Sequence, residues 1–457
     1  MKFRITIVIL LGCYVTGIAQ DTPRIITFGE AVKIGLEKNI ALAQQENFLV
    51  TAKTDKTSGL LGMGPSVNIN GSAGRNTGNS FIQQEGRVVN GVTDFTSATI
   101  NARMPLFQGL SNVNSYKQFS DAYDAQLYST QYSKQEVMRN VAQQYLTCLL
   151  DQQLVRINQK NLESQEQQYS QISEQVLAGS RAEVDQLNQE YQVKNANLLL
   201  LRAKNTLRND KARLAITLQL DPALQFELQE PGWQPSQYDG MSLDELYTIA
   251  DERRADLATT RHQESASRFS YKAVKGGYFP SIVAFLNYGS AYNYIHPNDI
   301  ITNPNNRSFD EQFFTDNTQL TYGVSFNIPV FNRYSTKSSV IRRRMLYENA
   351  KLETENKQVQ VKGDVLLAYQ NLQDAKASFD AAEAQLNAAR VSNELERERY
   401  QLGISDIVAL TQSNQALTLA ETDYEGARFT LMFQQILINF ATGTLKFEDI
   451  PGSEASN

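Results

Sequence analysis

The chain of 457 residues contains one pattern twice, and this duplication constrains its fold more than any other feature. Three pairs of segments correspond, namely 28–39 with 243–254, 104–109 with 328–333, and 176–184 with 400–408. Pro105 and Gly179 lie 74 residues apart, and so do Pro329 and Gly403. Equal spacing over so long a segment indicates an internal structural repeat.

We therefore expect a first repeat at 20–231, a second at 232–447 and a tail at 448–457. Each repeat should hold a helix of about 30 residues, two strands, a very long helix, a glycine turn and another long helix. In the first repeat the helix near 28–60 precedes strands near 65–76 and 94–106, a long helix to 178 and a helix at 181–220. In the second, the helix near 242–275 precedes strands near 280–291 and 318–331, a long helix to 402 and a helix at 405–441. The fold class is thus mixed α and β.

The strand segments alternate between apolar and polar residues. In QLTYGVSFNIPV, the residues Leu320, Tyr322, Val324 and Phe326 fall on one face, and polar or small residues fall on the other. Alternation over ~10 residues is typical of a membrane barrel strand with lipid outside and water inside. A half-buried sheet packed against helices produces the same alternation, so both alternatives remain open at this point.

The long helices carry a heptad pattern. Val365, Leu372, Phe379 and Leu386 recur every seven residues, and a second series of mostly alanines accompanies them. Apolar residues at this period form the seam of packed helices, and alanines allow a close approach. Cys148 falls 224 residues before Leu372, so we expect a buried seam residue there. About 70 helical residues reach ~100 Å, which no globular core needs.

The N-terminus has the features of a secretory signal peptide at residues 1–19. Lys2 and Arg4 precede an apolar run, and small residues before Gln20 favour cleavage after Ala19. The alternative is a lipobox that ends at Cys13, which would make that residue a lipidated anchor. No later stretch reaches the ~20 apolar residues that a membrane helix needs.

Composition excludes several classes of function. A net charge of -6 and a pI near 5.3 argue against nucleic acid as a partner. His262 and His296 have no ligand-like spacing, so we expect solvated side chains and no metal site. The sequence has no phosphate-binding loop, zinc-protease or nucleophile-elbow motif. We therefore expect no cofactor and no enzyme activity.

Four strands per chain cannot close a barrel, since a membrane barrel has no unpaired edge and at least eight strands. Two copies would give eight strands with a nearly filled interior, and three copies would give twelve, which leaves a channel. The long helices would continue this wall as a tube. The sequence therefore favours a duct built from a homotrimer.

The chain resembles the TolC-like outer-membrane factors. The resemblance rests on the duplicated order of elements and on ARMPLFQG at 102–109, NIPVFNR at 327–333 and YQLGISDIVAL at 400–410. It implies a homotrimer in the lipid bilayer of the outer membrane, with a 12-stranded barrel and a 12-helix periplasmic tube. It also implies a passive exit duct for efflux or type I secretion, coupled to a periplasmic adaptor and an inner-membrane RND or ABC transporter. The alternative is a structural coiled-coil or adhesin-like protein, which the heptads alone would fit.

In this family the periplasmic end of the tube is closed near the helix turns by tyrosine, acidic and basic side chains. By this resemblance Tyr400 matches the aperture tyrosine. The positions of two family aspartates fall at Ala409 and Gln412, and the position of the arginine falls at Ser405. The expected closing network is therefore altered in this chain.

Other side chains near the turns are candidates for the aperture. Glu183, Asp185 and Asp406 would form a ring of carboxylates in a trimer, or they are ordinary solvated charges at a hairpin end. The tips that would meet the adaptor are expected at Gly179, Ser180, Gly403 and Ile404.

Overall fold

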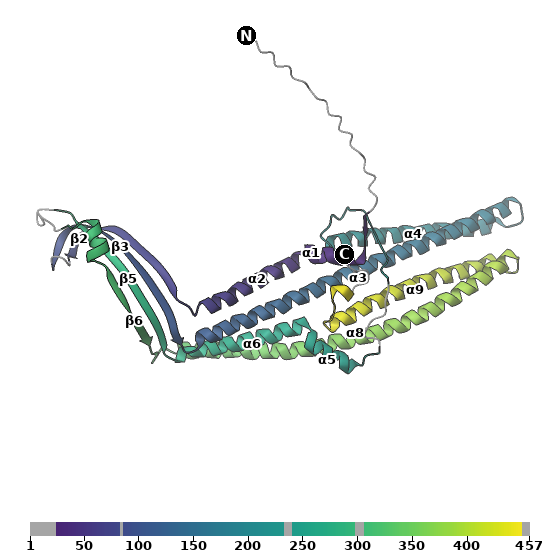
Figure 1. The fold of residues 1–457 in the computed structure, drawn as a ribbon. Coiled ribbons are helices and arrows are strands. Elements are labelled where there is room, and N and C mark those ends of the chain that lie inside the picture. The colour runs from purple at the N-terminus through teal and green to yellow at the C-terminus, as the bar shows by residue number, and fades with distance from the viewer. Residues whose placement is uncertain (1–23, 83–85, 233–239, 298–305, 450–457) are drawn as a thin grey trace, which may run out of the picture.

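The computed structural model describes residues 24–82, 86–232, 240–297 and 306–449 (Figure 1). The expected signal peptide at 1–19, with Cys13, and residues 450–457 of the tail lie outside the described residues. A β-sheet occupies one end of an elongated molecule, and two helix turns occupy the other end (Figure 1). The expected mixture of α-helices and β-strands is confirmed.

The elements follow in an order that is the same in both halves. The first half contains β1 (Arg24–Ile26), α1 (Phe28–Lys38), α2 (Ile40–Leu61), β2 (Ser66–Ile82), β3 (Arg87–Gln108), α3 (Ser111–Leu177), α4 (Glu183–Thr217) and β4 (Phe226–Leu228). The second contains α5 (Leu243–Arg253), α6 (Ala255–Lys275), η1 (Gly276–Tyr278), β5 (Ser281–Ile295), α7 (Phe309–Glu311), η2 (Gln312–Asp316), β6 (Gln319–Asn327), α8 (Ser335–Gln401), α9 (Ile407–Ala441) and η3 (Phe447–Asp449).

The long helices of the two halves have equal lengths. α3 and α8 each contain 67 residues, and α4 and α9 each contain 35. Left-handed residues precede both of the longest helices, with φ of 63° at Leu110 and 67° at Tyr334. Leu110 and Tyr334 are 224 residues apart, the spacing of the sequence repeat. These equal lengths support the proposal that the chain is two repeats, 20–231 and 232–447.

The helices expected near 28–60 and 242–275 are each broken, and the prediction of one continuous helix was wrong. Asn39 ends α1 and begins α2, because its backbone is extended and its side chain accepts a hydrogen bond from the Leu42 N–H at 2.9 Å. Arg254 separates α5 from α6 in the same way, with ψ of 113°. Each break falls at the last residue of a matched sequence segment.

Three strands are longer than the sequence predicted, and one is shorter. β2 and β3 extend well beyond 65–76 and 94–106, because their ladder continues through pairs such as Gly78 with Gly91. β5 runs past the expected end at 291. β6 ends at Asn327 instead of 331, where its partner strand begins and just before Pro329, which has no N–H to donate.

The four long strands form one antiparallel sheet with the order β2-β3-β5-β6. β3 and β5 join the two halves of the chain at its centre. β2 and β6 are therefore the two edges, and neither has a further partner among the described strands.

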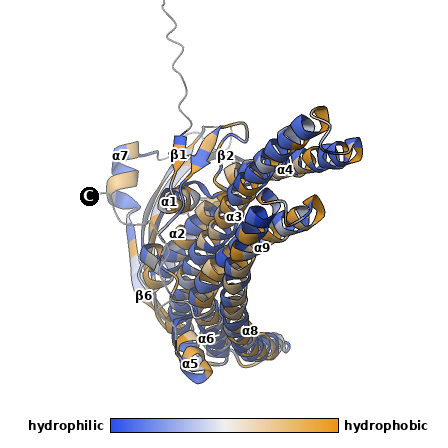
Figure 2. Ribbon diagram, turned by 90° about the vertical axis from the view of Figure 1, so that its right-hand side faces the viewer, coloured by the Kyte–Doolittle hydropathy of each residue, from blue (hydrophilic) through white to orange (hydrophobic). Residues whose placement is uncertain are grey.

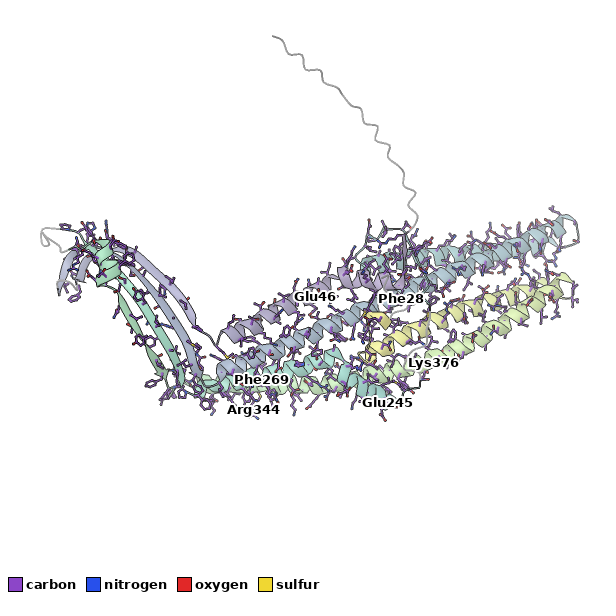
Figure 3. All side chains as sticks on the ribbon, in the orientation of Figure 1. Phe28, Glu46, Glu245, Phe269, Arg344 and Lys376 are labelled. Carbon is purple, nitrogen blue, oxygen red and sulfur yellow. The ribbon has the colours of Figure 1, made fainter. Side chains whose placement is uncertain are left out.

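The largest apolar core lies midway along the molecule, where α1 packs against α3. Phe28, labelled in Figure 3, stacks on Tyr145 with ring centroids 4.9 Å apart. The Tyr145 hydroxyl donates to the carbonyls of Ile26 and Gln229 at 2.9 and 2.7 Å, which ties α3 to the segments flanking β1 and β4. This belt fixes the helices where the two halves meet.

The predicted helix seam is buried at most of its positions. Val365 and Leu372 of α8 and Cys148 of α3 are at most 2% exposed, whereas Phe379 is half-buried. Burial raises the pKa of the Cys148 thiol to about 12, so the residue packs as an apolar side chain. Figure 2 shows hydrophilic and hydrophobic residues alternating along the helices. Within the described segments, no helix combines the length and the apolar character needed to cross a membrane.

Candidate functional site

Both helix turns lie at the end of the molecule opposite the sheet (Figure 1). Gly179 and Gly403 each have φ of 72°, a left-handed conformation that side chains other than glycine or asparagine resist. In both turns the next residue closes the helix, since Ser180 N–H donates to Gln175 and Ile404 N–H donates to Arg399, each at 2.9 Å. The structure therefore places the four predicted tip residues in two equivalent turns.

The apolar side chains of the tips are unusually exposed. Leu177 is 86% exposed, and Leu402 and Ile404 are 74% and 66% exposed. Helix turns of a soluble protein normally carry polar residues, so these three side chains mark a surface suited to a protein partner.

Tyr400 belongs to a network that joins the two turns. Arg181, in the first turn, donates from Nη1 to the Tyr400 hydroxyl at 2.7 Å, and its guanidinium lies 5.6 Å from the centre of the tyrosine ring. The same guanidinium is 3.8 Å from a carboxylate oxygen of Asp185. Arg181 thus connects a tyrosine of the second half with an aspartate of the first.

The sequence analysis missed Arg181, although the repeat spacing contained the signal that identifies it. Arg181 is the repeat partner of Ser405, because 181 + 224 = 405, and Asp185 is likewise the partner of Ala409. Ser405 and Ala409 are the positions at which the family resemblance led us to expect an arginine and an aspartate. The charged pair is therefore present in this chain, but in the first repeat.

The other carboxylates near the turns have different surroundings. Asp406 begins α9 as its N-cap and accepts from the Ala409 N–H at 2.8 Å. Glu183 lies in the first turn of α4. Ser405 donates a hydrogen bond to Glu396, which also pairs with Arg399 at 3.3 Å. Of the three acidic residues singled out from the sequence, the structure joins only Asp185 to Tyr400, and it does so through Arg181.

Near the tips the helix pairs are held together by polar side chains. Gln189 of α4 is 2% exposed and donates to the backbone and side-chain oxygens of Gln165 at 3.1 and 2.8 Å. Between α8 and α9, Asn393 donates to Ser413 at 3.2 Å and to Asn414 at 2.7 Å. Hydrogen bonds fix the register of each pair while burying less apolar area than the central belt does.

At the opposite end, cross-strand pairing sorts the sheet into two faces. Ile69, Ile100, Tyr288 and Leu320 pair successively across all four strands, so their side chains lie in one row. The adjacent row on the same face consists of Val67, Ala102, Leu286 and Tyr322. The row between these two, on the opposite face, consists of Asn68, Asn101, Asn287 and Thr321.

The apolar face of the sheet is not packed against helices. Ile69 and Tyr322 are both 75% exposed, and Leu320 is 56% exposed. The alternative of a sheet half-buried against helices is therefore wrong for this chain. A continuous apolar face bounded by two open strand edges requires a further environment and further strands.

Comparison with known proteins agrees with this geometry. At 21% identity the chain is similar to a probable efflux pump outer membrane protein, TtgC of Pseudomonas putida, over 83% of this chain and 75% of the relative. It is 22% identical to the outer membrane protein TolC of Escherichia coli, over 80% of this chain and 73% of TolC.

Solved structures show the same fold at low identity. The outer membrane protein VceC of Vibrio cholerae superposes with a TM-score of 0.77 at 13% identity, over 91% of this chain and 96% of VceC. The Campylobacter jejuni CmeC outer membrane channel gives a TM-score of 0.77 at 15% identity, over 91% and 85%.

A family model supplies the assignment. The model described as outer membrane efflux protein matches residues 61–218 and 246–444, which is well over half of the chain and covers both helix turns. The chain therefore belongs to the outer membrane efflux protein family, a family of outer-membrane channels with a periplasmic helical tube.

Proposed function

We propose that three copies of this chain close into a passive exit duct. The sheets would join edge to edge as a 12-stranded barrel in the outer membrane, and four long helices per chain would form the periplasmic tube. The observation that carries this proposal is the sheet itself. Its apolar face is exposed, and its edge strands β2 and β6 lack partners among the described strands.

The dimensions of the helices support a duct. α3 and α8 have 67 residues each, which corresponds to ~100 Å at about 1.5 Å per residue. A helical wall of that length, attached to a membrane sheet, suits a passage through much of the periplasm.

We propose that the helix turns are both the aperture and the docking end. The Arg181–Tyr400 contact would hold the two hairpins of each protomer together in the closed state. Exposed apolar residues beside Gly179 and Gly403 would meet a periplasmic adaptor, and an inner-membrane RND or ABC transporter would supply the energy. The chain itself would act without catalysis.

The cargo class follows from the relatives. Two of the Pseudomonas putida relatives are named as a toluene efflux pump and an antibiotic efflux pump outer membrane protein, each 21% identical to this chain. Efflux of small, largely apolar molecules is therefore the proposal that they support, and export of a polypeptide is the alternative.

Cysteine crosslinking tests the edge-to-edge assembly. Cysteines introduced together into β2, at Val67 or Ile69, and into β6, at Leu320 or Tyr322, should crosslink between copies under mild oxidation. The native Cys148 is fully buried and should not interfere. The expected product on a denaturing gel is a ladder that ends at three chains.

Matched cysteines in the central strand β3, at Ala98 or Ile100, should give no ladder. Crosslinking that stops at two chains, or none at any pairing of β2 with β6 in membrane-inserted protein, contradicts the trimeric barrel. A structural stalk or adhesin predicts the latter outcome.

A further inference from the structure

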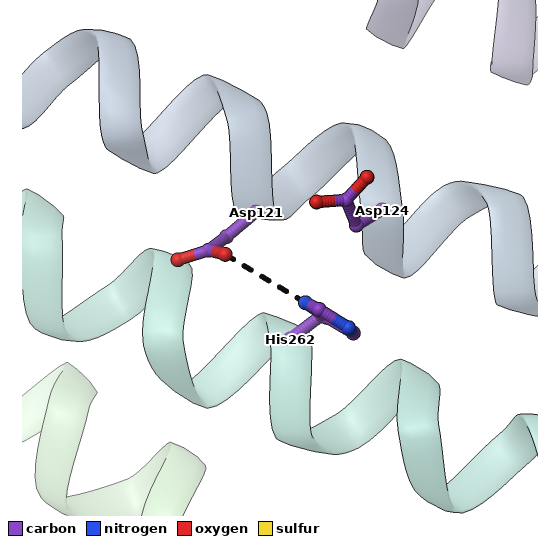
Figure 4. A group of neighbouring side chains, drawn as sticks. All are labelled: Asp121, Asp124 and His262. Atoms are coloured by element: carbon purple, nitrogen blue, oxygen red, sulfur yellow. Dashed lines mark ion pairs between the residues drawn. The ribbon is translucent and has the colours of Figure 1, made fainter.

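Three side chains of the kinds that bind metal ions meet between α3 and α6, far from the helix turns. Asp121 and Asp124 lie one turn apart on α3, and His262 faces them from α6 (Figure 4). Their candidate ligand atoms, one carboxylate oxygen from each aspartate and one imidazole nitrogen, all lie within 4.8 Å of one another. All three side chains are partly buried.

The spacing is close to what a zinc ion requires. Zinc bonds of about 2.0–2.2 Å in a tetrahedral arrangement place neighbouring ligand atoms roughly 3.4 Å apart. The His262 Nδ1 atom is 3.6 Å from the Asp121 carboxylate oxygen, as marked in Figure 4. Asp124 needs only a side-chain rotation to reach the same point, since residues three apart on a helix share a face.

A second observation points to a cation between these helices. The Oδ2 atom of Asp121 is buried and has no hydrogen-bond partner among the described residues. A buried carboxylate oxygen without a partner is costly, and a bound cation would compensate its charge. The neighbouring Tyr128 stacks on the His262 ring, with centroids 5.3 Å apart and planes 14° from parallel, and so holds the imidazole in place.

We propose that Asp121, Asp124 and His262 bind one divalent transition-metal ion of the zinc type per chain. One imidazole nitrogen and two carboxylate oxygens provide three ligands, and water would complete the coordination. The imidazole disfavours magnesium and calcium, which prefer oxygen ligands throughout.

Such an ion would brace the two halves of the chain. α3 belongs to the first half and α6 to the second. Asp121 lies ten residues after Ser111, which is ~15 Å from the end of α3 that adjoins the sheet. The brace would therefore strengthen the tube beside the membrane and leave the helix turns at the far end free to move.

Zinc binding to the purified full-length protein tests this proposal. The chain contains only two histidines, so the affinity tag must lack histidine. We expect one zinc ion per chain after dialysis, a thermal unfolding temperature that rises with zinc, and an X-ray absorption spectrum of nitrogen and oxygen ligands that includes one imidazole. His262→Gln, Asp121→Asn and Asp124→Asn should each weaken zinc binding by at least about tenfold.

His296→Gln is the matched control. His296 also pairs with an aspartate, with Nε2 2.8 Å from Asp94, but it lies at the far end of the sheet. This variant should bind zinc as the unaltered protein does. Absence of stoichiometric zinc in the unaltered protein overturns the proposal, as does equal binding by the His262→Gln and His296→Gln variants. The spectrum of the unaltered protein decides the matter if a variant fails to fold.

Discussion

Arg181 and Tyr400 lie 219 positions apart in the sequence, yet the arginine Nη1 donates to the tyrosine hydroxyl at 2.7 Å. This hydrogen bond joins the turn between α3 and α4 to the turn between α8 and α9. In the proposed trimer it would recur three times around the aperture and resist the outward movement of the hairpins.

Arg181→Gln should weaken closure. The partly exposed hydrogen bond contributes at most about 1.5 kcal/mol per protomer, so its loss should raise the open fraction of the channel without unfolding the tube. We expect larger or more frequent conductance steps and greater sensitivity of cells to bulky antibiotics. Tyr400→Phe should have the same effect, and the double variant should add little to either single change.

Arg399→Gln is the control for this experiment. Arg399 is equally close to a turn, but its ion pair is with Glu396 on the same helix. Its conductance should match that of the unaltered protein. If all three single variants behave alike, the closing role of Arg181 is wrong.

Gly403→Val should prevent adaptor docking. The left-handed φ of 72° costs a β-branched residue about 1–2 kcal/mol or more, although no neighbouring atom obstructs a side chain there. The turn should distort while the distant sheet still inserts and trimerises. We would measure trimer on unheated gels, and adaptor capture and export in cells. Gly403→Asn, which tolerates this conformation, should retain export, and the same pair of results is expected at Gly179.

The two faces of β6 should respond differently to arginine. Val324→Arg places a charge on the apolar face and should impair membrane insertion by ~2–4 kcal/mol at mid-depth. Ser325→Arg, on the polar face, should leave assembly intact and change ion selectivity. Insertion is measured by the yield of trimer in outer-membrane fractions. Equal losses of trimer from both variants would refute the assignment of the faces.

Stability should fall as the pH rises from about 4 to about 7. Burial, with the neighbouring Asp210 carboxyl, raises the pKa of Asp151 to about 7. Asp210 pairs with Arg213 at 3.0 Å, so Asp151 is the member of the pair that keeps a proton. Because the folded state holds this proton more tightly than the unfolded chain, stability from it is complete below pH 4 and is lost as the pH approaches 7.

Asp151→Asn mimics the protonated carboxyl. It should raise the unfolding temperature at pH 8 and have little effect at pH 4, which thermal denaturation of the trimer measures. Asp185→Asn, near the turn, should not alter this pH profile. A profile of the Asp151→Asn protein that keeps the full pH dependence would show that another group is responsible.

The long helices and the order of elements could be predicted because both are written twice, and local signals agree with each other. The outer half of β2 could not, since GSAGRNTGNS has the composition of a loop. Its strand structure comes from pairing with β3, which propensity does not contain. The breaks at Asn39 and Arg254 were missed because the apolar period continues across them.

The candidate site was only partly predictable for the same physical reason. The turns at Gly179 and Gly403 follow from local sequence, whereas the contact of Arg181 with Tyr400 depends on how the two helix pairs pack. The group of Asp121, Asp124 and His262 is likewise invisible in the sequence, because its ligands come from helices in different halves of the chain.

The measurement that tests the duct most directly is the conductance of the purified trimer in a planar lipid bilayer. The account predicts discrete, reproducible steps, enlarged by Arg181→Gln and unchanged by Arg399→Gln. Correctly folded, membrane-inserted trimer that never conducts, with or without the Arg181 substitution, would contradict it.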